Sequence, residues 1–301
     1  MKTKKERFEK PQTFLNRLHV VRRKISLMLI RTYEKLMASF TWAAAALTIS
    51  TLVFIIIFIL AKGIPYIKPS LFALKYNSEN VSLMPAMIST IIMTMLSLII
   101  AAPLGIFAAI FLVEYAKRGN KLVGIIAMTT ETLSGIPSIV YGLFGMLFFV
   151  TYLGFGFSVL SGVFTLSIMV LPLIIRSSEE ALKAVPDTYR EGSLGLGAGK
   201  LRTVFKVILP SAMPGILAGI ILSIGRIVGE TAALIYTAGT VAQIPTSLMQ
   251  SARTLSVHMY ALSGEGLHIG EGYATAVVLL FVVALINAIS AKIAKRIGGE
   301  T

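Results

Sequence analysis

Six apolar segments, each of about 20 residues or more, constrain the fold of this chain more than any other feature. They run approximately over residues 40–61, 85–113, 122–150, 158–176, 210–238 and 273–293. Each can cross a hydrocarbon core of roughly 30 Å as a helix. Because 55% of the 301 residues are hydrophobic and only 14% are charged, a soluble domain is excluded. The sequence predicts an all-α, polytopic membrane protein with six transmembrane helices, in which Pro103, Pro137 and Pro214 are candidate kinks.

Lysine and arginine are distributed unevenly over the segments outside the apolar runs. Of the 28 basic residues, 23 fall in one alternate set of these segments and 4 in the other. The richer set comprises residues 1–39, 114–121, 176–209 and the stretch from Lys292 onward. The positive-inside rule places this set, and both termini, on the cytoplasmic side of the cell's inner membrane. A net charge of +14 would suggest nucleic acid as the partner of a soluble protein, but here the location of the charge indicates the membrane, and no nucleic acid is expected.

Residues 1–39 form a basic arm with eleven Lys and Arg against three acidic residues. Apolar residues recur in it at helical spacing, at Leu18, Val21, Ile25, Met28, Leu29, Tyr33 and Leu36. This pattern predicts an amphipathic helix along the inner leaflet, where anionic lipid attracts basic side chains. A disordered arm is the alternative, above all before Phe14. Residues 40–296 are assigned to the transmembrane domain and 297–301 to a cytoplasmic tail, and no cleavable signal peptide is expected before Phe40.

The connection over residues 177–209 is polar, basic and rich in glycine, unlike the apolar runs on either side of it. Asp187 is expected to cap a short helix there, because its side chain can accept hydrogen bonds from the first free backbone N–H groups. That helix carries Tyr189, Arg190, Glu191 and Leu194. From Lys200 a second helix is predicted, with Leu201, Val204, Phe205 and Ile208 on one face.

Gly195, Gly197 and Gly199 separate the two short helices and predict a sharp turn, because glycine adopts positive φ without strain. Because both ends of this connection continue into membrane spans, a movement of the two short helices would be transmitted to both spans. A solvated loop without a partner is the alternative, although loops of this length without a role are uncommon. A nucleotide-binding loop is excluded, since no strand precedes these glycines and no Gly-Lys-Ser/Thr follows them.

The spacing of residues in this connection carries a resemblance. Glu191-Gly192-Ser193 is followed after three residues by Gly197 and, after nine more, by Val207-Ile208-Leu209-Pro210. This pattern resembles the EAA loop of binding-protein-dependent ABC importer permeases, although Gly192 and Ser193 stand in place of two alanines. The resemblance implies a MetI-like fold and docking of the loop on an ATP-hydrolysing subunit, present in two copies. The residues assigned to coupling are Asp187, Tyr189, Arg190, Glu191, Gly197, Leu201, Phe205, Leu209 and Pro210.

The same resemblance bears on catalysis and cofactors. It implies that ATP and Mg²⁺ are used by the partner ATPase, so this chain is expected to bind no cofactor and to be a transport subunit and not an enzyme. No Ser-His-Asp arrangement and no pair of carboxylates within one loop indicates hydrolysis. The outer connection 239–272 contains four possible metal ligands in a spacing that matches no closed zinc site, and the chain has no cysteine, so no metal is expected. Those four are Glu265, Glu271, His258 and His268.

Three ionisable residues lie where lipid is expected: Glu131 in the third apolar run, and Arg226 and Glu230 in the fifth. A charge at the bilayer centre costs at least ~2.5 kcal/mol, so such residues usually line a pathway or pair internally. Arg226 and Glu230 are four residues apart and can meet on one helix face, which makes a purely structural ion pair one hypothesis. The other is that the planar guanidinium of Arg226 binds a tetrahedral oxyanion, which Glu230 orients. Additional neutral donors would come from Ser134, Ser138 and Thr231.

The surroundings of Arg226 carry a narrower resemblance. Residues 226–234, RIVGETAAL, and residues 135–142, GIPSIVYG, are similar to phosphate importer permeases of the PstA type. This resemblance implies a permease subunit that imports inorganic phosphate, paired with a second permease of the PstC type and supplied by an external phosphate-binding protein. Two alternatives stay open: a permease for another oxyanion such as sulfate or molybdate, and an ion-coupled carrier that acts without ATP. The pairs Gly215/Gly219 and Gly225/Gly229 predict close packing of the fifth helix against another helix, either within this chain or in a second permease subunit.

Overall fold

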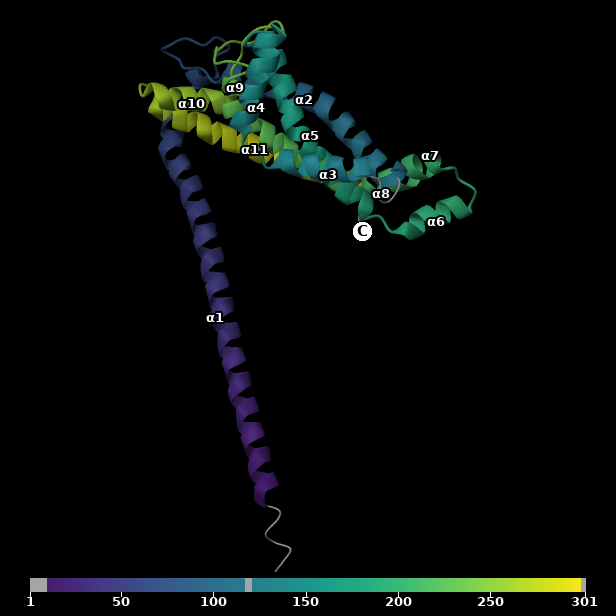
Figure 1. Cartoon of the computed structure of the whole chain (residues 1–301). Coiled ribbons are helices and arrows are strands. Elements are labelled where there is room, and N and C mark those ends of the chain that lie inside the picture. Colours follow the sequence, from purple (N-terminus) through teal and green to yellow (C-terminus); the bar gives the residue numbers. More distant parts are fainter. Residues whose placement is uncertain (1–9, 117–120, 299–301) are drawn as a thin grey trace, which may run out of the picture. The chain divides into compact units, whose positions relative to one another are not determined.

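The computed structural model describes residues 10–116 and 121–298, and every regular element within these ranges is a helix (Figure 1). The all-α prediction is therefore confirmed for the described part of the chain. The chain separates into two compact units, Met1–Phe58 and Ile59–Thr301. The second unit holds all of the residues predicted to bind substrate or to couple to a partner.

The first unit consists of most of α1, Lys10–Gly63, a single helix of 54 residues. The helix predicted for the basic arm is present from Lys10 onward, whereas residues 1–9 lie outside the described ranges. Its placement along the inner leaflet stays a prediction. Beyond residue 40 its large apolar side chains are exposed, among them Trp42 at 77%. The stretch Tyr33–Tyr66 is long and apolar enough to cross a membrane, where lipid would cover these side chains.

The second unit combines long helices with several short ones. The long helices are α2 (Met84–Ile110), α5 (Val159–Lys183), α8 (Leu209–Val228) and α11 (Ile269–Gly298). The short ones are α3 (Lys121–Ser134), α4 (Ser138–Gly145), α6 (Asp187–Gly195), α7 (Lys200–Thr203), α9 (Ala232–Ile235) and α10 (Leu255–Glu265). Five further short segments have other helix types. The 3-10 helices are η1 (Ile64–Tyr66) and η2 (Pro69–Phe72). The π-helices are η3 (Phe111–Tyr115), η4 (Met146–Tyr152) and η5 (Val204–Ile208).

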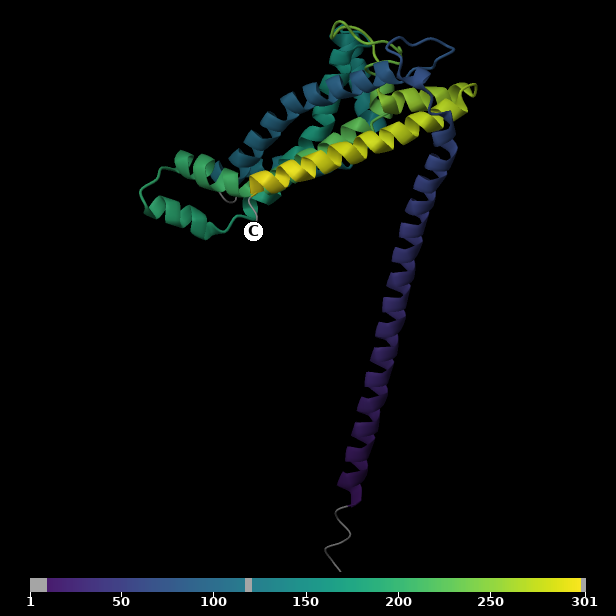
Figure 2. The same cartoon turned by 180° about the vertical axis from the view of Figure 1, so that it is seen from behind.

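The short helices α6 and α7 lie at one end of this unit, where α11 also ends, and α10 lies at the opposite end (Figures 1 and 2). The predicted coupling loop and the C-terminal part of the chain are therefore at the same end, as the count of basic residues requires. Which end faces the cytoplasm stays a prediction.

Helix α5 packs against both α2 and α8. Apolar residues of these helices, including Met93, Leu166 and Ile227, form the main core. Two glycines of α8 permit the close approach of α5. A Cβ atom at Gly215 would lie 2.7 Å from the Ala181 Cβ, and one at Gly219 would collide with Ser177. The helix packing predicted for this pair is confirmed.

The third apolar run does not form one helix. Helices α3 and α4 are bent by 102° relative to each other at residues 135–137, so the kink predicted at Pro137 is confirmed, and the run forms either a broken span or a re-entrant loop. Pro137 lacks a backbone N–H and disfavours helical geometry in the residue before it, which explains the break. The described residues contain five helices that are long and apolar enough to cross a membrane, or six if the bent pair is one span. Pro103 and Pro214, by contrast, lie inside helices that continue past them.

The fifth run is also shorter than predicted. Helix α8 ends at Val228, well before residue 238, and the backbone leaves helical geometry at Gly229–Thr231 before α9 begins. The Glu230 carboxylate oxygen Oε1 accepts a hydrogen bond from the Ala233 N–H at 3.0 Å. The side chain thus satisfies a donor at the start of α9 that would otherwise be free, which stabilises the break.

Candidate functional site

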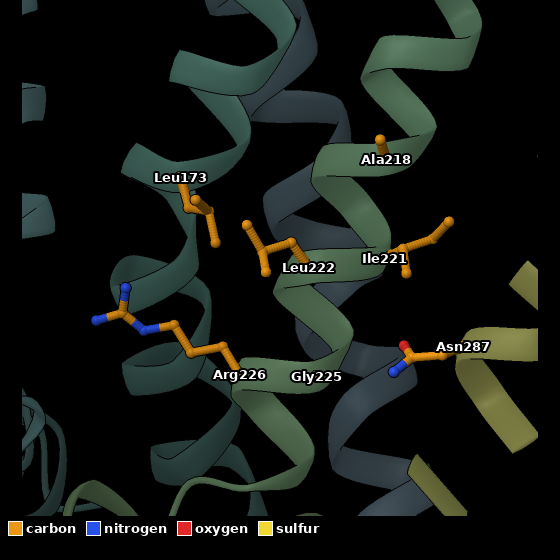
Figure 3. Close-up of a pocket in the computed structure, with 7 residues that line it drawn as sticks. All are labelled: Leu173, Ala218, Ile221, Leu222, Gly225, Arg226 and Asn287. Atoms are coloured by element: carbon orange, nitrogen blue, oxygen red, sulfur yellow. The ribbon is translucent and has the colours of Figure 1, made fainter. Parts of the chain in front are cut away.

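A cavity of about 720 Å³ lies beside the C-terminal half of α8, and Arg226 is the charged residue in its wall. The lining comes from α5, α8 and α11 and consists of Leu173, Ala218, Ile221, Leu222, Gly225, Arg226 and Asn287. Figure 3 shows the Arg226 side chain extending from α8 on the side of Leu173, away from Asn287. Apolar walls lower the local dielectric, so the attraction of this guanidinium for an anion is stronger here than in water.

Gly225 and Gly229 do not pack closely against another helix within the described part of this chain, so for this second pair of glycines packing against a second permease subunit stays a prediction. A Cβ at Gly225 would meet no atom within 4 Å, because the residue faces the cavity. At Gly229 the nearest atom is the backbone oxygen of Gly225, 3.5 Å away. The absence of a side chain at Gly225 leaves room beside the arginine.

Glu230 is 7% exposed and lies one helical turn beyond Arg226. Among the described residues the two form no ion pair, because the Glu230 side chain turns toward the backbone N–H of Ala233. The purely structural ion pair, one of the two hypotheses for these residues, is therefore not observed. The guanidinium of Arg226 has no carboxylate partner within the described part of the chain.

Of the predicted pathway residues, only Arg226 lines this cavity. Thr231 lies in the break after α8, where its hydroxyl donates to the Gly229 carbonyl at 3.4 Å. Ser134 donates to the Glu131 carbonyl at 2.7 Å within α3, and the Glu131 side chain is exposed. Ser138 is the first residue of α4. No hydrogen bond or ion pair between described residues joins Glu131 to Arg226.

From the sequence, no role in the site was assigned to Tyr141 or Asn287. Tyr141 is 5% exposed, donates its hydroxyl to the Leu133 carbonyl at 2.7 Å and lies within electrostatic range of Arg226. Asn287 lines the cavity from α11, more than 60 residues further along the chain than Arg226. A polar residue in an otherwise apolar helix is the signal that could have identified either one.

The predicted coupling loop forms two helical segments joined by a turn. Gly197 has φ of 84° and provides the left-handed geometry of the turn, whereas Gly199 has φ of −72°. Asp187 does not cap α6 through its side chain, so that prediction is wrong; its carboxylate instead pairs with Arg190 at 3.1 Å. The hydroxyls of Ser193 and Thr203 are 2.9 Å apart and connect α6 to the start of the second segment.

The second segment of the loop has two distinct faces. Val204 and Ile208 are fully buried against residues at the ends of α2 and α5. The predicted single apolar face is therefore divided, because Leu201 and Phe205 point outward. With α6 they leave a group of exposed large apolar side chains, at Tyr189, Leu194, Leu196, Leu201 and Phe205. Glu191 is exposed beside them, while Leu209 and Pro210 begin α8.

A buried polar cluster lies at the opposite end of the unit. The Arg253 guanidinium lies 4.7 Å from the ring centre of Tyr76, and the Tyr76 ring meets the His258 ring edge-on with centres 6.1 Å apart. Burial, together with the positive charge of Arg253, lowers the pKa of His258 from its usual 6.5 to about 3. His258 is therefore neutral at physiological pH. Within the described residues no group of three or more His, Cys, Asp or Glu is placed to hold a metal ion.

The chain matches one protein family over most of its length. Residues 101–299 match the model of the family described as "Binding-protein-dependent transport system inner membrane component". Two curated relatives are a phosphate transport system permease protein PstA 1 of Mycobacterium tuberculosis, 35% identical over 69% of each chain, and a probable ABC transporter permease protein YqgI of Bacillus subtilis, 37% identical over 57% of this chain. The present chain spans 63% of the length of the Bacillus relative.

Solved structures share the fold at low sequence identity. A methionine ABC transporter, MetNI, in an inward-facing conformation has a TM-score of 0.55 at 21% identity, covering 69% of this chain and 91% of its own. A bacterial alginate ABC transporter has a TM-score of 0.59 at 16% identity, covering 85% and 95%. The MetI-like fold is therefore confirmed. With its apolar helices and its similarity to PstA permeases, the chain belongs to the family of inner-membrane components of binding-protein-dependent transport systems.

Proposed function

We propose that this chain is the permease subunit of an ATP-driven importer of inorganic phosphate. The observation that carries the proposal is Arg226, whose guanidinium lines a cavity and has no carboxylate partner among the described residues. A planar guanidinium with donors available matches a tetrahedral oxyanion well. Because an isolated charge inside a membrane is costly, an anion that neutralises it in the cavity is favoured.

Phosphate is preferred over other oxyanions because of the relatives. Several of them are named phosphate transport system permeases, at 33 to 37% identity. Sulfate and molybdate have the same tetrahedral shape, so the geometry of one arginine does not distinguish them. Substrate competition is therefore part of the test of this proposal.

The second half of the proposal is coupling to an ATPase. Importing one negative charge against an inside-negative potential costs about 2.3 kcal/mol per 100 mV, and a divalent oxyanion faces twice that, so an energy source is required. The exposed apolar side chains of α6 and of the segment after Gly199 offer a surface for a partner, since such groups of side chains commonly mark interaction sites. We assign this surface to the ATPase, present in two copies.

The remaining partners follow from the family and from the arrangement of the helices. A second permease of the PstC type would complete the membrane part, and an external phosphate-binding protein would deliver the anion at the end that carries α10. Both termini and the coupling loop would then face the cytoplasm. In this assembly the chain itself binds neither ATP nor a metal.

Uptake of labelled phosphate by the reconstituted complex tests the substrate. Arg226→Gln should reduce uptake at least about tenfold, because a buried anion then loses its charged partner. Arg226→Lys should retain part of the uptake, since the charge stays but the fork of donors is lost. Arg176→Gln is the matched control, because Arg176 sits in an ion pair with Glu180 whose side chains are 52% and 68% exposed. Phosphate uptake by the Arg176→Gln complex should equal that of the wild type.

Three outcomes would overturn the proposal. Undiminished uptake by Arg226→Gln would show that this residue does not bind the cargo. Inhibition of phosphate uptake by equimolar sulfate or molybdate would show that the site selects a different oxyanion. Uptake that persists without the ATPase would indicate a carrier that works by itself.

A further inference from the structure

Glu114 is a buried carboxylate at the end of α2 that the proposed function does not use. It lies in the π-helical turn η3, Phe111–Tyr115, where α2 ends. Its side chain is 7% exposed, and it pairs with Arg190 of the coupling helix α6, 76 residues further along the chain. The Arg190 Nη2 and Nε atoms both donate to Glu114 Oε1, at 2.7 and 3.1 Å. A buried ion pair thus joins the coupling loop to a membrane helix.

Arg190 also holds the end of α5. Its Nη2 donates to the Leu182 carbonyl at 2.9 Å, and its Nη1 donates to the Val185 carbonyl at 2.8 Å. Carbonyl groups in the last turn of a helix have no intrahelical partner, so these bonds satisfy groups that would otherwise be free. One guanidinium therefore connects α6, the end of α5 and the end of α2.

The second half of the coupling loop reaches the same π-helical turn. The Lys200 ammonium at the start of α7 lies 4.9 Å from the ring centre of Tyr115, the last residue of η3. Adjacent residues of η3 therefore contact the two halves of the loop, Glu114 through α6 and Tyr115 through α7. A displacement of either half acts on the end of α2.

The burial of the Glu114–Arg190 pair separates it from the other ion pairs of this region. The pairs Arg176–Glu180 and Lys183–Glu179 have lysine or arginine side chains that are more than half exposed, and exposed pairs contribute little because water competes and salt screens them. The Glu114 side chain is 7% exposed, so water competes little for its pair with Arg190. Without the Glu114 charge, Arg190 keeps only its ion pair with Asp187, whose side chain is 72% exposed.

We propose that Glu114 is the positioning residue through which movement of the coupling loop reaches α2, an inference that rests on the proposed coupling of this loop to an ATPase. Helix α2 packs along α5 and against α8, which carries Arg226. A shift at η3 is thereby transmitted to the walls of the cavity. The π-helical turn suits this role, because its widened hydrogen-bond ladder is a local irregularity of the kind found at functional sites.

The test uses the whole reconstituted complex and measures two rates, ATP hydrolysis and phosphate uptake. Glu114→Gln keeps the size of the side chain but removes its charge. We expect the complex to assemble and to hydrolyse ATP, while the phosphate imported per ATP falls about tenfold, a typical size for coupling between two sites. Glu114→Asp keeps the charge and should restore much of the ratio. Glu180→Gln, in the exposed pair nearby, should leave the ratio at the wild-type value.

Each result decides a different point. An unchanged ratio of phosphate to ATP in Glu114→Gln overturns the role of Glu114. A loss of assembled complex that Glu114→Asp repairs without any change in the ratio shows that the pair is only structural, which also overturns it. Absence of phosphate uptake by the wild-type complex would contradict the proposed function instead. Thermal unfolding of each purified variant separates a loss of folding from a loss of coupling.

Discussion

Glu230 lies one helical turn after Arg226, yet its carboxylate binds the backbone N–H of Ala233 at 3.0 Å and forms no ion pair with the arginine. The glutamate therefore has a structural task of its own, at the start of α9. Its negative charge nevertheless stays near the cavity. These two properties are separable, because a hydrogen bond to a backbone N–H needs an acceptor and not a charge.

Glu230→Gln and Glu230→Ala should differ in stability. The glutamine retains an acceptor oxygen, so unfolding should change little. The alanine leaves the Ala233 N–H without a partner and should cost about 1 kcal/mol, as the loss of a helix cap does. Thermal unfolding of the purified complex measures both. If the two variants unfold alike, the hydrogen bond is not what maintains the break after α8.

The two small-residue pairs of α8 should respond in opposite ways to a methyl group. Gly219→Ala places a Cβ against Ser177 and should destabilise the packing of α5 on α8 by about 1–3 kcal/mol, the usual cost of overpacking. Gly225→Ala meets no atom within 4 Å and should be neutral or slightly stabilising, since alanine favours helix over glycine. Denaturation of both variants under the same conditions provides the comparison, and equal losses of stability would refute it.

Leu196, 91% exposed at the end of α6, should matter to the partner and not to the fold. Leu196→Glu should reduce the amount of ATPase that co-purifies with the chain, because it places a charge in the exposed apolar group. The chain's own stability should stay within about 0.5 kcal/mol, as is usual for surface changes. Leu267→Glu is the matched control, since Leu267 is 84% exposed just before α11, at the other end of the unit. Co-purification unchanged by Leu196→Glu would argue against this docking surface.

His258 should make the stability of the protein depend on pH. Its folded-state pKa of about 3 lies below the usual 6.5, so only the unfolded chain gains a proton between these values. The free energy of unfolding should therefore be fully retained above pH 6.5 and fall by about 1.4 kcal/mol per pH unit below it. The groups that face this ring are Arg253, which is positive, and Tyr76.

Replacing the histidine tests that slope. His258→Gln cannot gain the proton, so its loss of stability between pH 6.5 and 5.5 should be smaller by about 1 kcal/mol than that of the wild type. His268→Gln is the control, because His268 is partly exposed and lies 3.7 Å from the Glu271 carboxylate. Unfolding curves at several pH values measure both. Parallel slopes for the wild type and His258→Gln would contradict the prediction.

The sequence predicted the membrane class, the family and the two-part coupling loop, because apolar length and the spacing around Glu191 are local properties. It predicted a kink at Pro137 but not the end of α8 at Val228. Within residues 210–238, an interruption of the helix depends on partners such as the Glu230 side chain, which accepts a hydrogen bond from the Ala233 N–H and which only the folded chain brings into place. The prediction that Asp187 caps α6 was wrong for a similar reason, since Arg190 competes for its carboxylate.

Residues whose contacts join distant parts of the sequence were the hardest to predict. Glu114 looks from the sequence like the first polar residue after an apolar run, and only the fold brings Arg190 to it. Arg226 was recognised because a charge within an apolar run is conspicuous in any sequence. Asn287 and Tyr141 are less conspicuous, and their roles follow from helices that meet only in three dimensions.

The two interrupted helices meet each other. Helix α4 packs on α9, and a Cβ at Gly142 would lie 2.7 Å from the Ala233 Cα, so the two backbones are nearly in contact. Both interruptions leave backbone N–H and C=O groups without helical hydrogen bonds, and lipid tails cannot bond to them. Non-helical backbone within a membrane is therefore stable only where protein or water surrounds it. The free peptide groups where α4 meets α9 therefore need hydrogen-bond partners from protein or water, because lipid offers none.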